Sequence, residues 1–208
     1  MANADHGTSR LSFPHRALTR IEGKPTAITV TNLRKEIYAN AQAIPSLGSG
    51  EHGFLGLVMD PAAYFARTGT VFVVPIYPGI QANHAAGLTG PQITAANRAY
   101  DAALNIFEKY AAVKKELCGK ILSALDKTYF DELEDVVFGF TDVTSLQLLN
   151  HLQINYATLS PDNLEINRMS LTKVWTPKEP ISKLWTRIKY HKEIAAAGNE
   201  PLADGTVI

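Results

Sequence analysis

Apolar side chains recur at intervals of three or four residues along most of this chain, a spacing that places them on one face of a helix. One such stripe runs over 29–44 and ends at Pro45. Two more cover 93–107 and 113–125, and a fourth covers 146–156. Because each apolar face must be covered by another element, we predict a helical bundle in which the last three stripes are buried against each other.

Residues that favour helix N-termini mark where further helices should begin. Asp60 can accept hydrogen bonds from the free amides of a first turn, and Pro61 fits the first helical position. Thr144 and Gln147 have the spacing of a capping box. Ser160, which is also followed by proline, predicts another helix start.

The run 70–76 is rich in β-branched and aromatic residues, which favour an extended backbone. No second segment has a comparable pattern, and an isolated strand cannot carry a fold. We therefore predict an all-α protein with at most a short extended segment near 70–76. The next stretch, 77–92, is rich in Gly, Pro, Ala and Asn and longer than most loops, so it is the best candidate for a surface projection.

Both ends of the chain differ from its helical middle. Residues 1–24 carry several basic side chains and few that could form a core, which is typical of a flexible N-terminal arm. Two prolines interrupt the pattern between Trp175 and Pro180, where we expect a boundary. Beyond it, Ile181 and Trp185 belong to one more amphipathic stripe, which either docks back on the bundle or opens a second domain.

Composition and charge are those of an ordinary globular protein. Twenty basic residues balance twenty acidic ones, so no overall charge drives the chain toward nucleic acid or an anionic membrane. Cys118 is the only cysteine, which excludes an intramolecular disulfide and fits a reducing compartment. The N-terminus has no signal-like apolar run, and no apolar stretch is long enough to span a bilayer. We expect a cytoplasmic protein that does not enter a membrane.

The loop 46–56 matches the nucleotide-binding pattern G-x-G-x-x-G by letter, through Gly48, Gly50 and Gly53. Its context contradicts that interpretation, because a helical pattern precedes it and no acidic residue follows at the distance of the ribose contact. Phe54 also occupies the position of the phosphate-loop lysine. The simpler interpretation is a tight loop that folds the following apolar residues back onto the core.

Catalytic and metal-binding signals are weak throughout the sequence. None of the six histidines lies three or four residues from another histidine or from Cys118. The acidic residues of 126–135 are best explained as a solvated helix face. His52 is the most defensible functional guess, although a hydrogen bond to the loop backbone explains it better than proton transfer. We predict no catalytic residue, no metal site and no cofactor.

A series of short signatures extends over residues 18–198. In chain order they are the run 18–25, the pair Asn40–Ala41, the loop 48–56 with His52, Tyr64, residues 72–75, the pair Pro78–Gly79, the long helical block and residues 146–156. Together they resemble the Gag region of copia-type LTR retrotransposons.

The resemblance implies an all-helical, capsid-like structural protein without catalytic groups, which assembles into virus-like particles around the RNA of its element. Residues 25–175 would form the capsid-like N-terminal domain, and 176–208 would open a second helical domain or dock as a C-terminal helix. This chain departs from the family because it has no Cys/His zinc knuckle and no basic tail. RNA would therefore be contacted through a region absent from this chain.

We accordingly expect a homo-oligomeric structural protein. Two alternatives stay open: a helical ligand-binding or protein-interaction module without self-assembly, whose loop 77–92 recognises a partner, and an enzyme that uses the loop 48–56. The candidate loop and interface residues are Gly48, Gly50, His52, Gly53, Tyr77, Pro78, His84, Trp175 and Trp185.

Overall fold

Helices and their connections make up the chain in the computed structural model, which describes residues 11–46, 50–81, 87–176, 178–198, 200 and 202. The elements are α1 (Ala27–Ala43), the 3-10 turns η1 (Gly50–His52) and η2 (Leu55–Leu57), α2 (Pro61–Thr68), α3 (Gly90–Ala124), the 3-10 helix η3 (Lys127–Leu133), α4 (Ser145–Tyr156), α5 (Pro161–Leu171) and α6 (Ile181–Ala197). No strand occurs in these residues. The predicted all-α class is confirmed.

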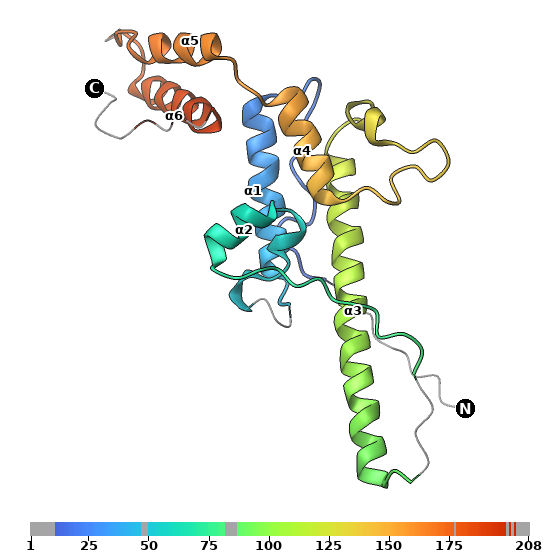
Figure 1. Ribbon diagram of the computed structural model, residues 1–208. Helices are drawn as coiled ribbons and strands as arrows, with labels where there is room; N and C mark the ends of the chain where they lie inside the picture. Colours follow the sequence, from blue (N-terminus) through green and yellow to red (C-terminus); the bar gives the residue numbers. More distant parts are fainter. Residues whose placement is uncertain are drawn as a thin grey trace.

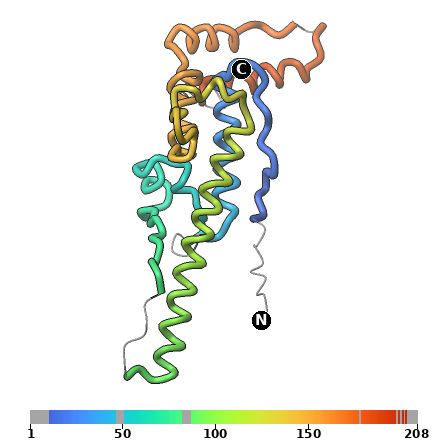
Figure 2. Tube along the Cα trace, turned by 90° about the vertical axis from the view of Figure 1, so that its right-hand side faces the viewer, coloured from blue at the N-terminus to red at the C-terminus, as the bar shows by residue number. Residues whose placement is uncertain are grey.

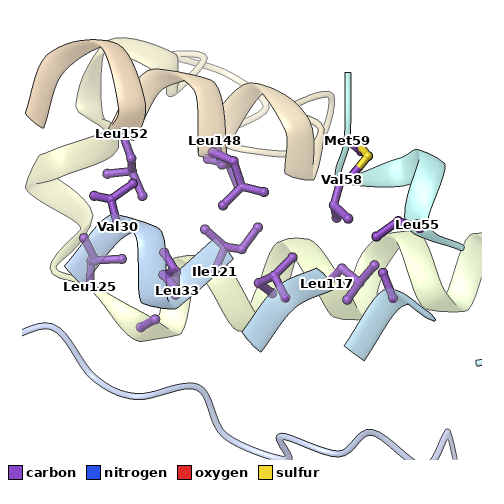
Figure 3. Close-up of a cluster of buried hydrophobic side chains, with 14 of the residues drawn as sticks. Val30, Leu33, Leu55, Val58, Met59, Leu117, Ile121, Leu125, Leu148 and Leu152 are labelled. Atoms are coloured by element: carbon purple, nitrogen blue, oxygen red, sulfur yellow. The ribbon is translucent and has the colours of Figure 1, made fainter. Parts of the chain in front are cut away.

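The hydrophobic core lies where α1, α4 and the C-terminal half of α3 meet (Figure 1). In Figure 3, Leu152 of α4 points toward Val30 of α1, and Leu148 of α4 points toward Ile121 of α3. All four side chains are completely buried. Because each contributes roughly 1.5–3 kcal/mol through burial, this three-helix junction dominates the stability of the fold.

Local sequence signals place the helix ends as expected. The Asp60 carboxylate accepts from the Ala62 amide at 2.9 Å and begins α2. At the start of α4, the Gln147 amide donates to the Thr144 hydroxyl at 3.2 Å, and the Gln147 side chain accepts from the Thr144 amide at 2.8 Å. At the start of α5, the Ser160 hydroxyl accepts from the Asn163 amide at 3.2 Å. These three predicted helix starts are confirmed.

α3 differs from the prediction, because the two stripes of 93–107 and 113–125 lie on one uninterrupted helix of 35 residues. The linking residues 108–112 contain neither proline nor glycine, so nothing ends the helix between the stripes. The helix is about 50 Å long, and its N-terminal half projects beyond the bundle (Figures 1 and 2). The expected burial of the 93–107 stripe against other helices is therefore wrong.

Residues 11–24, predicted as part of a flexible arm, run along the bundle in an extended course beside α3 (Figure 2). Phe13 and Ile21 are buried in the core, and the Ile21 amide donates to the last carbonyl of α3 at 2.8 Å. The His15 amide donates to the Asn40 side-chain oxygen at 2.8 Å, and the Asn40 amide nitrogen donates back to the His15 carbonyl at 3.0 Å. These contacts fix the described part of the arm to the bundle.

α5 and α6 lie side by side, and α6 also contacts α1 (Figure 1). The buried side chain of Asn167 in α5 donates to the His191 carbonyl at 2.9 Å, and its oxygen lies 2.6 Å from His191 Nδ1. The expected boundary between Trp175 and Pro180 thus lies in the connection between α5 and α6, and these two helices contact each other.

Acid should weaken the contact between α5 and α6. Burial, followed by the charge of Arg187, lowers the pKa of His191 below its usual value of 6.5. Because the folded state favours neutral imidazole, local unfolding takes up a proton below pH 6.5. The stabilisation is therefore complete above pH 6.5 and is lost as the pH falls through the folded pKa.

Hydrogen exchange of the α6 amides, corrected for the intrinsic pH dependence of exchange, measures this effect. We expect protection to fall below pH 6.5 in the natural sequence and to stay level in a His191→Gln variant, which cannot titrate. The same pH dependence in both proteins would contradict the assignment.

Candidate functional site

The glycine-rich loop lies at the C-terminal end of α1. The Phe54 amide donates to the Ala41 carbonyl at 2.8 Å, which satisfies one of the free carbonyls at that helix end. Gly53 has a φ of +51°, and a Cβ atom there would lie 2.5 Å from the Gln42 carbonyl oxygen. Phe54 and Leu55 then enter the core. The loop therefore returns Phe54 and Leu55 to the core, as the simpler interpretation of its glycines predicted.

His52 and Tyr64 bring two polar atoms into the interior beside this loop. Their rings meet edge-on with centroids 6.5 Å apart, and the Phe72 ring also meets that of Tyr64 edge-on, at 5.8 Å. Among the described residues, neither His52 Nδ1 nor the Tyr64 hydroxyl has a hydrogen-bond partner. The expected bond from His52 to the loop backbone is therefore not made at this nitrogen. Gly48, the first glycine of the pattern, and all of 47–49 lie outside the described residues.

The segment 70–81, which holds Tyr77 and Pro78, follows the projecting half of α3 instead of projecting on its own (Figure 1). The Tyr77 ring lies 5.3 Å from that of Phe107, and the Tyr100 hydroxyl donates to the Gly79 carbonyl at 3.0 Å. Several apolar side chains nevertheless face solvent: Val71, Val73, Val74, Ile76 and Ile80. His84 lies outside the described residues. This segment is a fixed, extended surface with exposed apolar groups.

A tight turn at 135–139, which the sequence interpretation did not identify, presents three strongly exposed apolar side chains. Val136, Val137 and Phe138 are 101%, 78% and 65% exposed. Asp135 and Gly139 exchange both backbone hydrogen bonds at 2.9 Å. The Asp135 carboxylate accepts from the Val137 and Phe138 amides at 2.8 Å, and these bonds lower its pKa. The turn therefore holds its apolar tip in solvent in one conformation. In the sequence, the feature that could have indicated this turn is the run Val-Val-Phe-Gly directly after an acidic stretch.

A groove of about 560 Å³ lies between the N-terminal half of α1 and α6. Ile28, Trp185 and Ile188 give it apolar walls, and Lys35 and Lys189 stand on the two sides. Trp185 is exposed, so its indole is available to a partner. Trp175, the other candidate tryptophan, is half-buried in the connection between α5 and α6 and does not line this groove.

The predicted candidates do not form one site. The glycine loop contacts α1 at 41–44, whereas the groove with Trp185 uses α1 at 28–35. About 15 Å of helix separates the two regions. Tyr77 and Pro78 form a third region beside α3. The chain thus offers several separated surfaces.

Polar groups elsewhere are largely engaged in structural contacts. His151 Nε2 lies 2.9 Å from the Tyr129 carbonyl, and Cys118 Sγ lies 3.1 Å from the Ser145 hydroxyl. Within the described ranges, no three His, Cys, Asp or Glu side chains are grouped so that they could hold a metal ion. None of the helices in that part of the chain is long and apolar enough to cross a membrane.

Comparisons with known proteins give no relative: no family model, no curated protein and no solved structure matches this chain. The likeness to retrotransposon Gag proteins therefore stays a prediction from the sequence.

Proposed function

We propose that this chain is a structural, Gag-like capsid protein that self-assembles into virus-like particles, which package the RNA of a retroelement. The observation that carries the proposal is the exposure of large apolar side chains on segments that are themselves held in place. The turn 135–139 is closed by four hydrogen bonds, and the segment 70–81 is fixed to α3, yet both leave apolar groups in solvent. Exposed apolar groups of this kind mark interaction surfaces.

The arrangement of these interaction surfaces favours assembly of many copies over a single pairwise contact. The turn, the extended segment and the groove with Trp185 belong to different parts of the molecule. A subunit of a shell needs contacts with several neighbours, and such contacts join unlike surfaces of identical chains. The core of α1, α3 and α4 supplies the rigid body that can hold them at fixed angles. In this proposal RNA is bound through a region outside this chain.

A protein-interaction module without self-assembly is the second candidate. The segment 70–76 favours it, because no backbone hydrogen bond joins its amides and carbonyls to another described segment. Such an edge can accept an extended peptide from a partner. This candidate predicts a protein that remains monomeric at all concentrations.

Electron microscopy of the purified protein, combined with size-exclusion chromatography over a concentration series, tests the proposal. We expect regular closed particles that form at high concentration and dissociate on dilution, because weak contacts between identical subunits depend steeply on concentration. Uniform monomers under several salt conditions would overturn the proposal and leave the interaction module as the better account.

A further inference from the structure

We infer that the apolar turn 135–139 of one copy docks into the α1–α6 groove of a second copy. This contact rests on the proposed self-assembly and specifies two of the surfaces that would carry it.

The turn has the properties of an inserting element. Val137 and Phe138 stand at its tip in solvent, while the backbone below them is closed by the Asp135–Gly139 pair. Next to the turn, Phe140 packs its ring against Phe130 of the core at a centroid distance of 6.5 Å. Because the turn is already ordered in the free chain, binding loses little conformational entropy.

The groove has a matching size and character. Its volume of about 560 Å³ is within the roughly 300–1,000 Å³ of sites that enclose small organic molecules. That is enough room for two or three apolar side chains. Trp185 offers an exposed indole on one wall, and tryptophan is among the residues that contribute most to protein interfaces.

The charges around the two surfaces are opposite. Residues 126–142 carry six carboxylates and one lysine, a net charge of −5. The groove lining carries three basic residues and one acidic residue, a net charge of +2: Lys35, Lys189, Lys192 and Glu193. An acidic surround on the turn and a basic surround on the groove attract each other and set the orientation of docking. The chain as a whole is neutral, but it carries both an acidic and a basic surface, so a second copy can supply the complementary charge for each.

The positions of the two surfaces exclude a contact within one molecule. Figure 1 places α6 and the connection from η3 to α4 on opposite sides of α1 and α4. One copy can therefore use its turn on one neighbour and its groove on another. A contact of this head-to-tail type continues from subunit to subunit and forms a ring, a filament or a shell.

Site-directed cross-linking tests the contact directly. In a Cys118→Ala background, a Val137→Cys protein is mixed with a Lys189→Cys protein under mild oxidation. We expect a disulfide-linked heterodimer of the two. The matched control replaces Val137→Cys with Ile154→Cys, which is another exposed apolar position, on α4 and outside the surfaces proposed for assembly. Cross-linking no greater than in this control overturns the inference.

Charge and polarity variants give a second readout. Val137→Asp in the turn and Lys189→Glu in the groove should each weaken self-association by roughly tenfold or more. Lys183→Glu, on α6 but outside the groove lining, should leave it unchanged. Mixing the two weakened variants should restore one-to-one pairing through this contact, because each retains the surface that the other lacks. Unchanged self-association in both variants overturns the inference.

The outcomes separate this contact from the proposed function. Closed particles without the Val137–Lys189 cross-link would overturn the contact and leave the capsid-like function standing. The cross-link without particles would support the contact and overturn the particle-forming function. A monomer without the cross-link overturns both.

Discussion

Replacing Leu148 with alanine is expected to lower the free energy of unfolding by about 3–5 kcal/mol, the range found when a buried leucine is truncated. Leu148 is completely buried on α4 and points toward Ile121 of α3 (Figure 3). Its truncation removes apolar contacts and leaves a cavity that the surrounding helices fill only in part. Urea unfolding followed by circular dichroism measures the change.

Ile154→Ala on the same helix is the matched control. Ile154 is 71% exposed, so its truncation should change the free energy of unfolding by less than about 0.5 kcal/mol. Both substitutions end in alanine on α4, so most of the difference in helix propensity cancels. Equal losses in the two variants would show that α4 does not pack on α1 and α3 as described.

Gly53→Ala is expected to cost about 2–4 kcal/mol, from a left-handed backbone and a steric clash together. The left-handed φ of +51° accounts for part of this cost. The added methyl group would also lie 2.5 Å from the Gln42 carbonyl oxygen and 2.6 Å from that of Ile44. Backbone atoms at a helix end cannot move aside as a flexible side chain can. The loop must therefore shift, taking Phe54 with it. Denaturant unfolding measures the loss.

Gly69→Ala separates the two causes. Gly69 ends α2 with a φ of +71°, and a Cβ atom there would meet no other atom within 4 Å. It should cost about 1–2 kcal/mol, the backbone contribution alone. If Gly53→Ala cost no more than Gly69→Ala, the close approach of the loop to α1 would be incorrect.

The sequence predicts those parts of the fold that depend on neighbouring residues. The helix starts at Asp60, Thr144 and Ser160 are local, because the capping side chain and the amides it satisfies lie within three residues. The burial of the stripe 113–125 was also predicted, because the spacing of its apolar residues indicates which face of the helix becomes buried. These helix starts and this buried face follow from local signals alone.

Features that depend on distant partners were not predicted. Periodicity gave the 93–107 stripe the same weight as the 113–125 stripe, but only the second meets other helices. Nothing near Phe13 and Ile21 indicates that these two side chains enter a core whose members extend along the chain to Ala157. The basic composition of the arm therefore suggested flexibility where the chain is packed.

The features of the candidate site also fall into those that local sequence predicts and those that depend on distant partners. The role of Gly53 could be predicted, because a glycine between a helix and an apolar run indicates a turn. The groove beside Trp185 could not, since it exists only where α6 meets α1. The turn 135–139 lay between these cases: its glycine and its apolar residues were visible, but their exposure depends on how η3 and α4 are placed.

Sedimentation equilibrium of the purified chain over a wide range of concentrations tests most directly the claim that this helical body is built to contact copies of itself. The account predicts a weight-average mass that equals the 22.7 kDa monomer at the lowest concentrations and rises continuously to large assemblies. A mass that stays at 22.7 kDa over the whole accessible range, at low and at high ionic strength, would contradict it.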